Sequence, residues 1–225
     1  MKIHIYISLF LLPFLSTAQP KINIQPLFGN QPLQLETKWY SLHDTDSIAI
    51  DVLKFYISAI ELLQDDKPVW IEKNSFHLVD ASQTATLLIP LSVPEKIIYN
   101  AIKLNVGIDS LTNSAGAKGG DLDPTTGMYW TWQTGYINFK LEGRSTECDS
   151  RKNEFQFHIG GYAAPNNSLQ TIRLPFSSVQ NTITIDLRKM LFALNLKSNN
   201  HIMSPGEPAI KVAQLIPQVV NSVKP

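Results

Sequence analysis

The stretch GGDLDPTTGMYWTWQTGYINFKLEG, residues Gly119 to Gly143, carries the clearest pattern in this chain. The Asp, Pro and Gly residues at its start favour a tight turn, because Asp side chains bond the nearby backbone and proline fixes its own φ. Apolar and polar residues alternate from Tyr136 to Leu141, which is the period of a half-buried β-strand. Gly135 separates this strand from an aromatic run, Met128 to Trp132. The stretch therefore predicts a turn followed by two strands.

The aromatic run contains two tryptophans, Trp130 and Trp132. In an extended chain, residues two apart point to the same side, so both indoles would share one face. One explanation is a hydrophobic core, because aromatic side chains bury large areas. The other is a site for redox chemistry or metal contact, beside Met128 and the carboxylates of Asp121 and Asp123. Both explanations remain open at the level of sequence.

Short strand-like runs separated by turn formers dominate the chain, at the spacing typical of a sandwich or barrel. These runs span residues 33–40, 48–62, 69–71, 76–79, 86–89, 97–108, 128–132, 136–141, 155–159, 169–174 and 182–187. Helical signals are few and late, at residues 187–196 and 208–216, where Pro208 suits a first helical turn. We therefore expect an all-β fold: a single antiparallel β-sandwich-like domain over residues 19–225, with one or two short helices near the C-terminus.

Residues 1–18 begin with one lysine, continue with an apolar run and end in Ser16, Thr17 and Ala18. This pattern is typical of a secretory signal peptide cleaved after Ala18, and it predicts a periplasmic or extracellular protein. The apolar run is too short to span a bilayer, so no membrane insertion is expected.

Charge and motif content exclude several functional classes. The 19 Lys and Arg residues balance 19 Asp and Glu residues, which gives no electrostatic case for nucleic-acid binding. The single cysteine, Cys148, cannot form an internal disulfide, so a hydrophobic core must hold the fold. Asp121 and Asp123 resemble the start of a calcium loop, but the remaining ligands of an EF-hand are missing. No nucleophile elbow or phosphate loop occurs, and we expect a protein that is not an enzyme.

The histidines beyond residue 18 are the candidate metal ligands: His43, His77, His158 and His201. In FQFHIGGY the apolar residues Phe155, Phe157 and Ile159 share one strand face, which places His158 on the other. A histidine on a polar strand face can equally be solvated or hydrogen-bonded. Because no two histidines have the close spacing of a zinc site, a metal centre would have to be assembled from distant segments.

Six blocks together resemble the MbnP-like family, in its Bacteroidetes-type branch. They are LKFYISAIEL (53–62), FHLVD (76–80), IKLNVGIDS (102–110), GDLDPTTGMYWTWQTGYINFKLEG (120–143), FQFHIGGY (155–162) and HIMSPG (201–206). This exported family is named for the periplasmic protein associated with methanobactin copper handling. The resemblance implies a β-sandwich-like domain in the cell envelope that binds copper.

In better understood members of that family, histidines and a tryptophan oxidised to kynurenine hold the copper, and a di-haem peroxidase-like partner is linked to the oxidation. By resemblance, Trp130 and Trp132 are the candidates for an oxidised tryptophan. The candidate copper ligands are His158, His77, His43, His201 and Met203, with Trp39 close to His43 in the sequence. Imidazole and thioether groups suit copper better than they suit hard cations.

Three hypotheses follow. An exported copper-binding carrier, scavenger or sensor requires at least two of the histidines to converge near a Trp or Met. A non-catalytic envelope module that recognises a glycan or protein partner would leave the histidines scattered and both Trp130 and Trp132 buried. A hydrolase using Asp121 or Asp123 would need a cleft with a second carboxylate at working distance.

Overall fold

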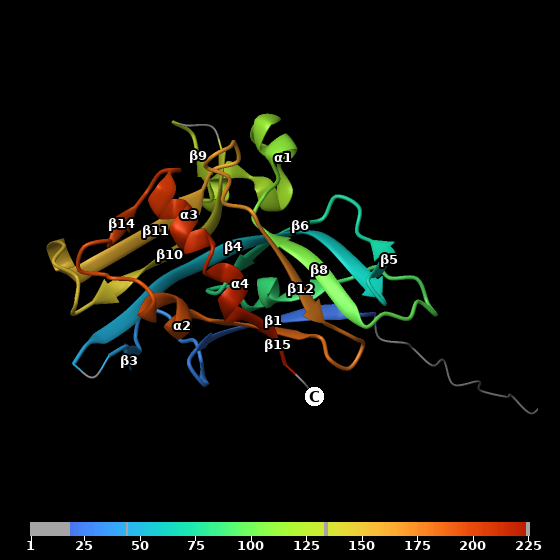
Figure 1. The fold of residues 1–225 in the computed structure, drawn as a ribbon, viewed down its shortest axis with the longest axis horizontal. Helices are drawn as coiled ribbons and strands as arrows, with labels where there is room; N and C mark the ends of the chain where they lie inside the picture. Colours follow the sequence, from blue (N-terminus) through green and yellow to red (C-terminus); the bar gives the residue numbers. More distant parts are fainter. Residues whose placement is uncertain (1–18, 44, 133–134, 224–225) are drawn as a thin grey trace, which may run out of the picture.

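The computed structural model describes residues 19–43, 45–132 and 135–223, which form two sheets with a core between them (Figure 1). The path of the larger sheet is β12 (Gln170–Pro175), β8 (Ala101–Val106), β4 (Ser47–Gln64), β10 (Gly135–Ser145), β11 (Glu154–Gly160) and β14 (His201–Ile202). Off this path, β4 also pairs with β3 (Trp39–Ser41), β5 (Lys67–Ile71) and β6 (Phe76–Asp80), and β10 pairs with β9 (Tyr129–Trp130). The long strand β4 therefore organises this sheet.

The smaller sheet has the order β15 (Val220–Ser222), β13 (Thr182–Asp186), β1 (Lys21–Phe28) and β2 (Gln31–Pro32), and β7 (Leu88–Pro90) also pairs with β1. The predicted sandwich-like β fold is confirmed. Most strand pairs are antiparallel, but β1 pairs with β13 and β11 pairs with β14 in parallel. Parallel pairing requires a long crossover connection, and both pairs join strands that are far apart in the sequence.

The predicted helices near the C-terminus are also present. They are α2 (Leu187–Phe192), α3 (Glu207–Ala213) and α4 (Ile216–Val219), and Pro208 lies in the first turn of α3 as expected. Helix α1 (Ser110–Ser114) was not predicted; it begins where the side chain of Asp109 accepts a hydrogen bond from the backbone N–H of Thr112. Short 3-10 helices span Thr84–Leu87, Gly120–Leu122, Pro124–Thr126 and Arg151–Asn153.

Two of the predicted strand runs take other forms. Residues 33–40 are not one strand, because Glu36 has a φ of +65° and interrupts the extended backbone between β2 and β3. Residues 84–87 form a 3-10 turn before β7 begins at Leu88. Among the described residues, none of the helices has the length and hydrophobicity needed to cross a bilayer.

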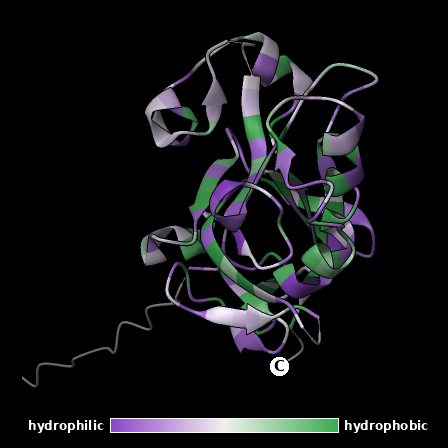
Figure 2. Ribbon diagram, turned by 90° about the vertical axis from the view of Figure 1, so that its left-hand side faces the viewer, coloured by the Kyte–Doolittle hydropathy of each residue, from purple (hydrophilic) through white to green (hydrophobic). Residues whose placement is uncertain are grey.

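The apolar residues form two cores, one on each face of the larger sheet. In β4, Phe55 and Ile57 belong to the main core between the sheets, whereas Tyr56 belongs to a second, smaller core. Because successive residues of a strand point to opposite faces, the second core lies on the far face of the sheet. It consists of Tyr56, Ile108, Leu122, Met128, Trp130, Tyr136 and Ile137. The hydrophobic segments concentrate where sheets and helices face each other (Figure 2).

Candidate metal site

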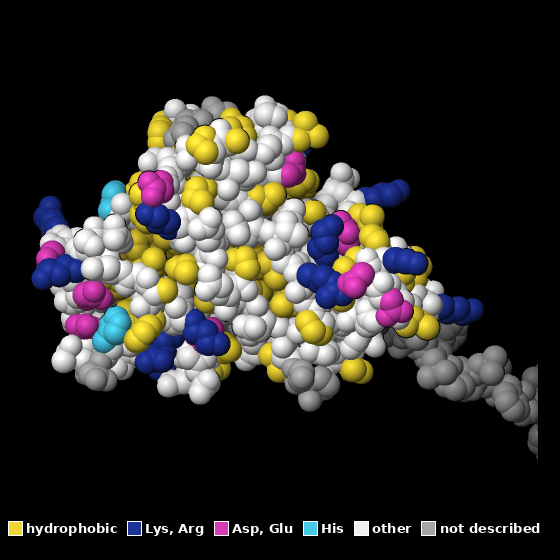
Figure 3. Space-filling model, in the orientation of Figure 1, with side chains coloured by type: hydrophobic (Ala, Val, Ile, Leu, Met, Phe, Trp, Pro, Cys, Tyr) yellow, Lys and Arg dark blue, Asp and Glu magenta, His cyan; other side chains and the backbone are white. Residues whose placement is uncertain are grey.

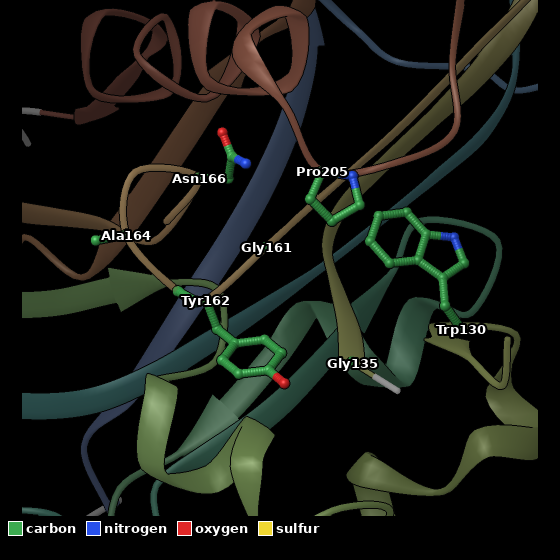
Figure 4. A pocket seen from close by; sticks show the side chains of 8 residues that line it. Trp130, Gly135, Gly161, Tyr162, Ala164, Asn166 and Pro205 are labelled. Atoms are coloured by element: carbon green, nitrogen blue, oxygen red, sulfur yellow. The ribbon is translucent and has the colours of Figure 1, made fainter. Parts of the chain in front are cut away.

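Trp130 is the largest side chain of the second core and is 6% exposed. Its strand β9 pairs with the start of β10, where Trp130 faces Gly135. The indole also packs directly on Gly160 of β11: a Cβ built on this glycine would lie 2.5 Å from Cζ3 of the ring. A pocket of about 190 Å³ beside the indole is bounded by Pro205 and Tyr162 (Figure 4). Because Gly160 has no side chain, the indole of Trp130 can approach β11 this closely.

Trp132 has a different environment from Trp130, because β9 ends at Trp130. Because the strand ends before Trp132, the two indoles do not share one strand face, in contrast to the expectation from an extended chain. The side chain of Trp132 is 65% exposed. The rings are nevertheless neighbours, with centroids 6.0 Å apart and an interplanar angle of 51°. One indole is thus buried in the second core, and the other lies next to it at the surface.

His158 lies on β11 and points to the face that carries Trp130. Residues 158 and 160 of a strand face the same side, and the missing Cβ of Gly160 would point at the indole. Nε2 of His158 lies 2.6 Å from Oε1 of Glu142, and Nζ of Lys140 lies 3.3 Å from the same oxygen. The hydrogen bond from His158, aided by Lys140, holds the pKa of Glu142 below its usual value although burial opposes this.

This pairing is the arrangement expected of a metal-binding histidine. Such histidines usually donate the ring N–H that does not bind metal to a carboxylate, which fixes the tautomer and the ring orientation. In His158 the carboxylate contact uses Nε2, so Nδ1 is the nitrogen available to a metal. His158 is only 7% exposed, which restricts the positions that its ring can adopt.

His201 reaches the same face of the sheet from β14. In the parallel pair β11–β14, His201 is the partner of Gln156, and Gln156 lies two residues before His158 on β11. Partnered residues point to the same side, so His158 and His201 are diagonal neighbours on one face. Met203 follows two residues later, is partly buried and lines a shallow pocket with His201 and Pro205. The structure therefore brings His158, His201 and Met203 to one edge of the sheet, beside Trp130.

His77 lies elsewhere. It is on β6, where it pairs with Ile57 of β4, and strands β4 and β10 separate β6 from β11. Asp80 of β6 lies in one cross-strand row with Lys54, Lys140 and His158, so Asp80 and His158 point to the same face of the sheet. His77 comes three residues before Asp80 on β6 and therefore points to the opposite face. Nε2 of His77 lies 2.8 Å from Oε2 of Glu72. Burial acts to raise the pKa of Glu72, but hydrogen bonds from His77 and Ser75 outweigh it and lower the value.

His43 occupies a third location, in the turn between β3 and β4. Its ring packs on Phe192 with centroids 4.7 Å apart, whereas the ring of Trp39 lies under the guanidinium of Arg144. One ligand atom each from His43, Asp46 and Glu147 lie within 4.8 Å of one another. Of these three residues, only His43 stands out in the sequence as a candidate ligand. Asp46 stands in the HDTD turn beside it, but Glu147 has no sequence signal, because it comes from a distant strand end.

Asp121 and Asp123 have structural contacts that explain their presence. Oδ2 of Asp121 accepts a hydrogen bond of 2.9 Å from the backbone N–H of Leu78, and Oδ1 of Asp123 accepts one of 2.8 Å from that of Thr125. Neither aspartate belongs to a group of three metal-type ligands among the described residues. Their carboxylates hold the loop over the second core.

Acidic and basic side chains alternate on the face shown in Figure 3, without a large patch of one sign. The histidines visible on that face lie toward its left side, where Figure 1 places β3, β11 and β14.

The comparisons with known proteins identify the family. A family model described as MbnP matches residues 17–204. This chain belongs to the MbnP family. The structure is similar to that of MbnP from Methylosinus trichosporium, with a TM-score of 0.57 and 12% sequence identity over 86% of each chain. At this identity the likeness supports the fold alone. A comparison with curated protein sequences gave no match.

The MbnP match covers the edge of the larger sheet described above. Trp130, His158, His201 and Met203 all lie within residues 17–204, whereas helices α3 and α4 lie beyond the matched range. The side chains that the fold brings together are therefore part of the matched MbnP domain rather than of its C-terminal continuation.

Proposed function

We propose that this MbnP-family protein is an exported copper-binding protein that acts as a carrier, scavenger or sensor and has no catalytic turnover. The observation that carries the proposal is the placement of His158 and His201 on one face of the larger sheet. Met203 follows His201 just after β14, and Trp130 packs on β11, the strand that carries His158. The family resemblance supplies copper as the metal. Export rests on the signal-peptide pattern of residues 1–18, which lie outside the described part of the chain.

The donor set at this edge fits copper chemistry. Imidazole nitrogen and thioether sulfur are ligands that suit Cu(I), and imidazole also binds Cu(II). In the proposed site Nδ1 of His158 is one donor, and Glu142 keeps its ring in position through Nε2. His201 is exposed and Met203 is partly buried, so copper would reach the site from the His201 side.

The proposal includes oxidation of one of the two neighbouring indoles by a di-haem peroxidase-like partner. Trp132 is largely exposed, so a partner protein could reach it directly. Trp130 is buried but packs on the strand that carries His158, which favours it as the indole closest to bound copper. Intact-mass analysis of protein isolated from its native envelope, followed by peptide mapping, would identify the modified residue.

Titration with Cu(I) in competition with a chelator tests the copper assignment. We expect one tightly bound copper per mature chain, and a loss of affinity of at least about tenfold in His158→Ala and in His201→Ala, because each removes a donor. His77→Ala is the matched control, since it removes another carboxylate-paired histidine on the opposite face.

Copper affinity that is unchanged in both His158→Ala and His201→Ala would contradict the proposed site. An absence of copper binding to the native-source protein would favour the alternative function, a non-catalytic envelope module that recognises a glycan or protein. The burial of Trp130 in the second core supports this alternative function.

A further inference from the structure

We propose that His43, Asp46 and Glu147 form a second metal site, separate from the copper site, that binds a divalent transition cation such as Zn²⁺. The three side chains come from the β3–β4 turn and from the segment that follows β10. They share no residue with the edge formed by β11 and β14.

Backbone hydrogen bonds hold the two segments against each other. The N–H of Leu42 donates to the carbonyl of Asp46 at 3.1 Å, and the N–H of Asp46 donates to the carbonyl of His43 at 3.4 Å, which closes the turn. Ser47 and Thr146 then join the turn to the end of β10: the N–H of Thr146 donates to the carbonyl of Ser47, and the N–H of Ser47 donates to Oγ1 of Thr146, both at 3.0 Å. Glu147 is thereby held beside the turn.

The ligand atoms already lie close to the separation that a metal ion requires. Nδ1 of His43 is 3.6 Å from Oδ2 of Asp46, and one oxygen of Glu147 lies within 4.8 Å of both residues' ligand atoms. Bonds of about 2.0–2.2 Å from zinc to nitrogen and oxygen place neighbouring ligands about 3–3.5 Å apart. Small side-chain rotations would therefore close the group around an ion. The ring of Phe192, packed on His43, limits the motion of the imidazole.

An independent observation at Glu147 supports cation binding by this cluster. Oε2 of Glu147 is buried and has no hydrogen-bond partner within the described part of the chain. The Glu147 side chain as a whole is partly buried, and a solvent-shielded oxygen without a hydrogen-bond partner is unfavourable. A cation held between Glu147, Asp46 and His43 would supply the missing interaction.

The donor set defines the class of metal. One imidazole nitrogen and two carboxylates suit zinc and similar divalent transition ions, and three protein ligands leave a position for water. Calcium prefers six to eight oxygen ligands, and Cu(I) prefers the sulfur and nitrogen donors present at the other site. Because Cu(II) would also bind these nitrogen and oxygen donors, and more tightly than Zn²⁺ does, zinc rather than copper is the probe for this site.

Calorimetric titration of the metal-free mature protein with zinc chloride tests this proposal. We expect a 1:1 site whose zinc affinity falls at least about tenfold in Glu147→Gln and in His43→Gln. His77→Ala should bind zinc as the parent protein does. Glu147 takes no part in the copper site, so Glu147→Gln should lose zinc affinity and keep the copper affinity of the parent protein, and the two proposals can fail separately.

Thermal unfolding without metal shows whether the variants fold. Glu147→Gln should be at least as stable as the parent protein, because its amide does not bury an uncompensated charge. Zinc should raise the unfolding temperature of the parent protein and not that of Glu147→Gln. Equal zinc affinity in the parent protein and both site variants, or a marked loss of metal-free stability in Glu147→Gln, would overturn the proposal.

Discussion

Gly160→Ala tests whether the close packing of Trp130 on β11 holds the second core together. The new Cβ would lie 2.5 Å from Cζ3 and 2.8 Å from Cη2 of the indole, and 2.7 Å from the backbone oxygen of Tyr136. Carbon atoms in normal contact are about 3.5–4.0 Å apart, so the ring would have to move by about 1 Å. The backbone oxygen belongs to β10 and cannot move independently of the sheet.

The size of the effect follows from this overlap. Adding a methylene to a well-packed core costs about 1–3 kcal/mol, and two rigid neighbours place Gly160→Ala in the upper half of that range. For a chain of this size each kcal/mol lowers the unfolding temperature by about 2–4 °C. We therefore expect Gly160→Ala to unfold about 4–12 °C below the parent protein.

Thermal unfolding followed by circular dichroism measures this change, and tryptophan fluorescence reports displacement of the buried indole. Gly119→Ala is the matched control, because a Cβ at Gly119 meets no atom within 4 Å and its φ of −93° suits any residue. The reasoning would be refuted if Gly160→Ala and Gly119→Ala unfolded at the same temperature with the same emission spectrum.

Two further predictions concern ionisable groups. Burial, reinforced by the charges of Glu147 and Asp149, raises the pKa of the Cys148 thiol to about 11. At pH 8 the native protein should therefore not react with a disulfide reagent, whereas the urea-unfolded protein should react fully. Full labelling of the native protein would contradict this prediction. Hydrogen bonding from His158 lowers the pKa of Glu142 in the folded protein. The stabilisation from this hydrogen bond is therefore fully present above the pKa that the carboxyl has in the unfolded chain, and it is lost as the pH falls through the lower pKa of the folded protein. Glu142→Gln should therefore be about 1–3 kcal/mol less stable than the parent protein in urea unfolding at pH 7. This difference should shrink below about pH 4, and one that grew at acid pH would contradict the assigned sign.

The strand pattern was largely predictable, because the alternation of side chains reports which face of a strand is buried. Phe155, Phe157 and Ile159 are buried in the main core, as their alternation indicates. The same pattern places His158 on the polar face, where a histidine is solvated or hydrogen-bonded, and the structure shows the hydrogen-bonded form, with Glu142 as the partner. The alternation does not report that His158 is only 7% exposed, nor that a second core containing Trp130 lies on the same face of the sheet.

The grouping of candidate ligands could not be predicted, because it depends on strand partners. His158 and His201 become neighbours only through the parallel pairing of β11 with β14, which no local pattern encodes. Glu147 meets His43 through contacts between Ser47 and Thr146, 99 residues apart in the sequence. The exposure of Trp132 depends on where β9 ends, and residue alternation does not report strand ends.

A crystal structure of the copper-loaded protein, with anomalous scattering recorded on both sides of the copper absorption edge, would show directly whether His158, His201 and Met203 bind copper. We expect a copper peak between the side chains of His158 and His201, within bonding reach of Met203. A strong copper peak at His43, Asp46 and Glu147 with none at the β11–β14 edge, or no copper peak at all, would contradict it.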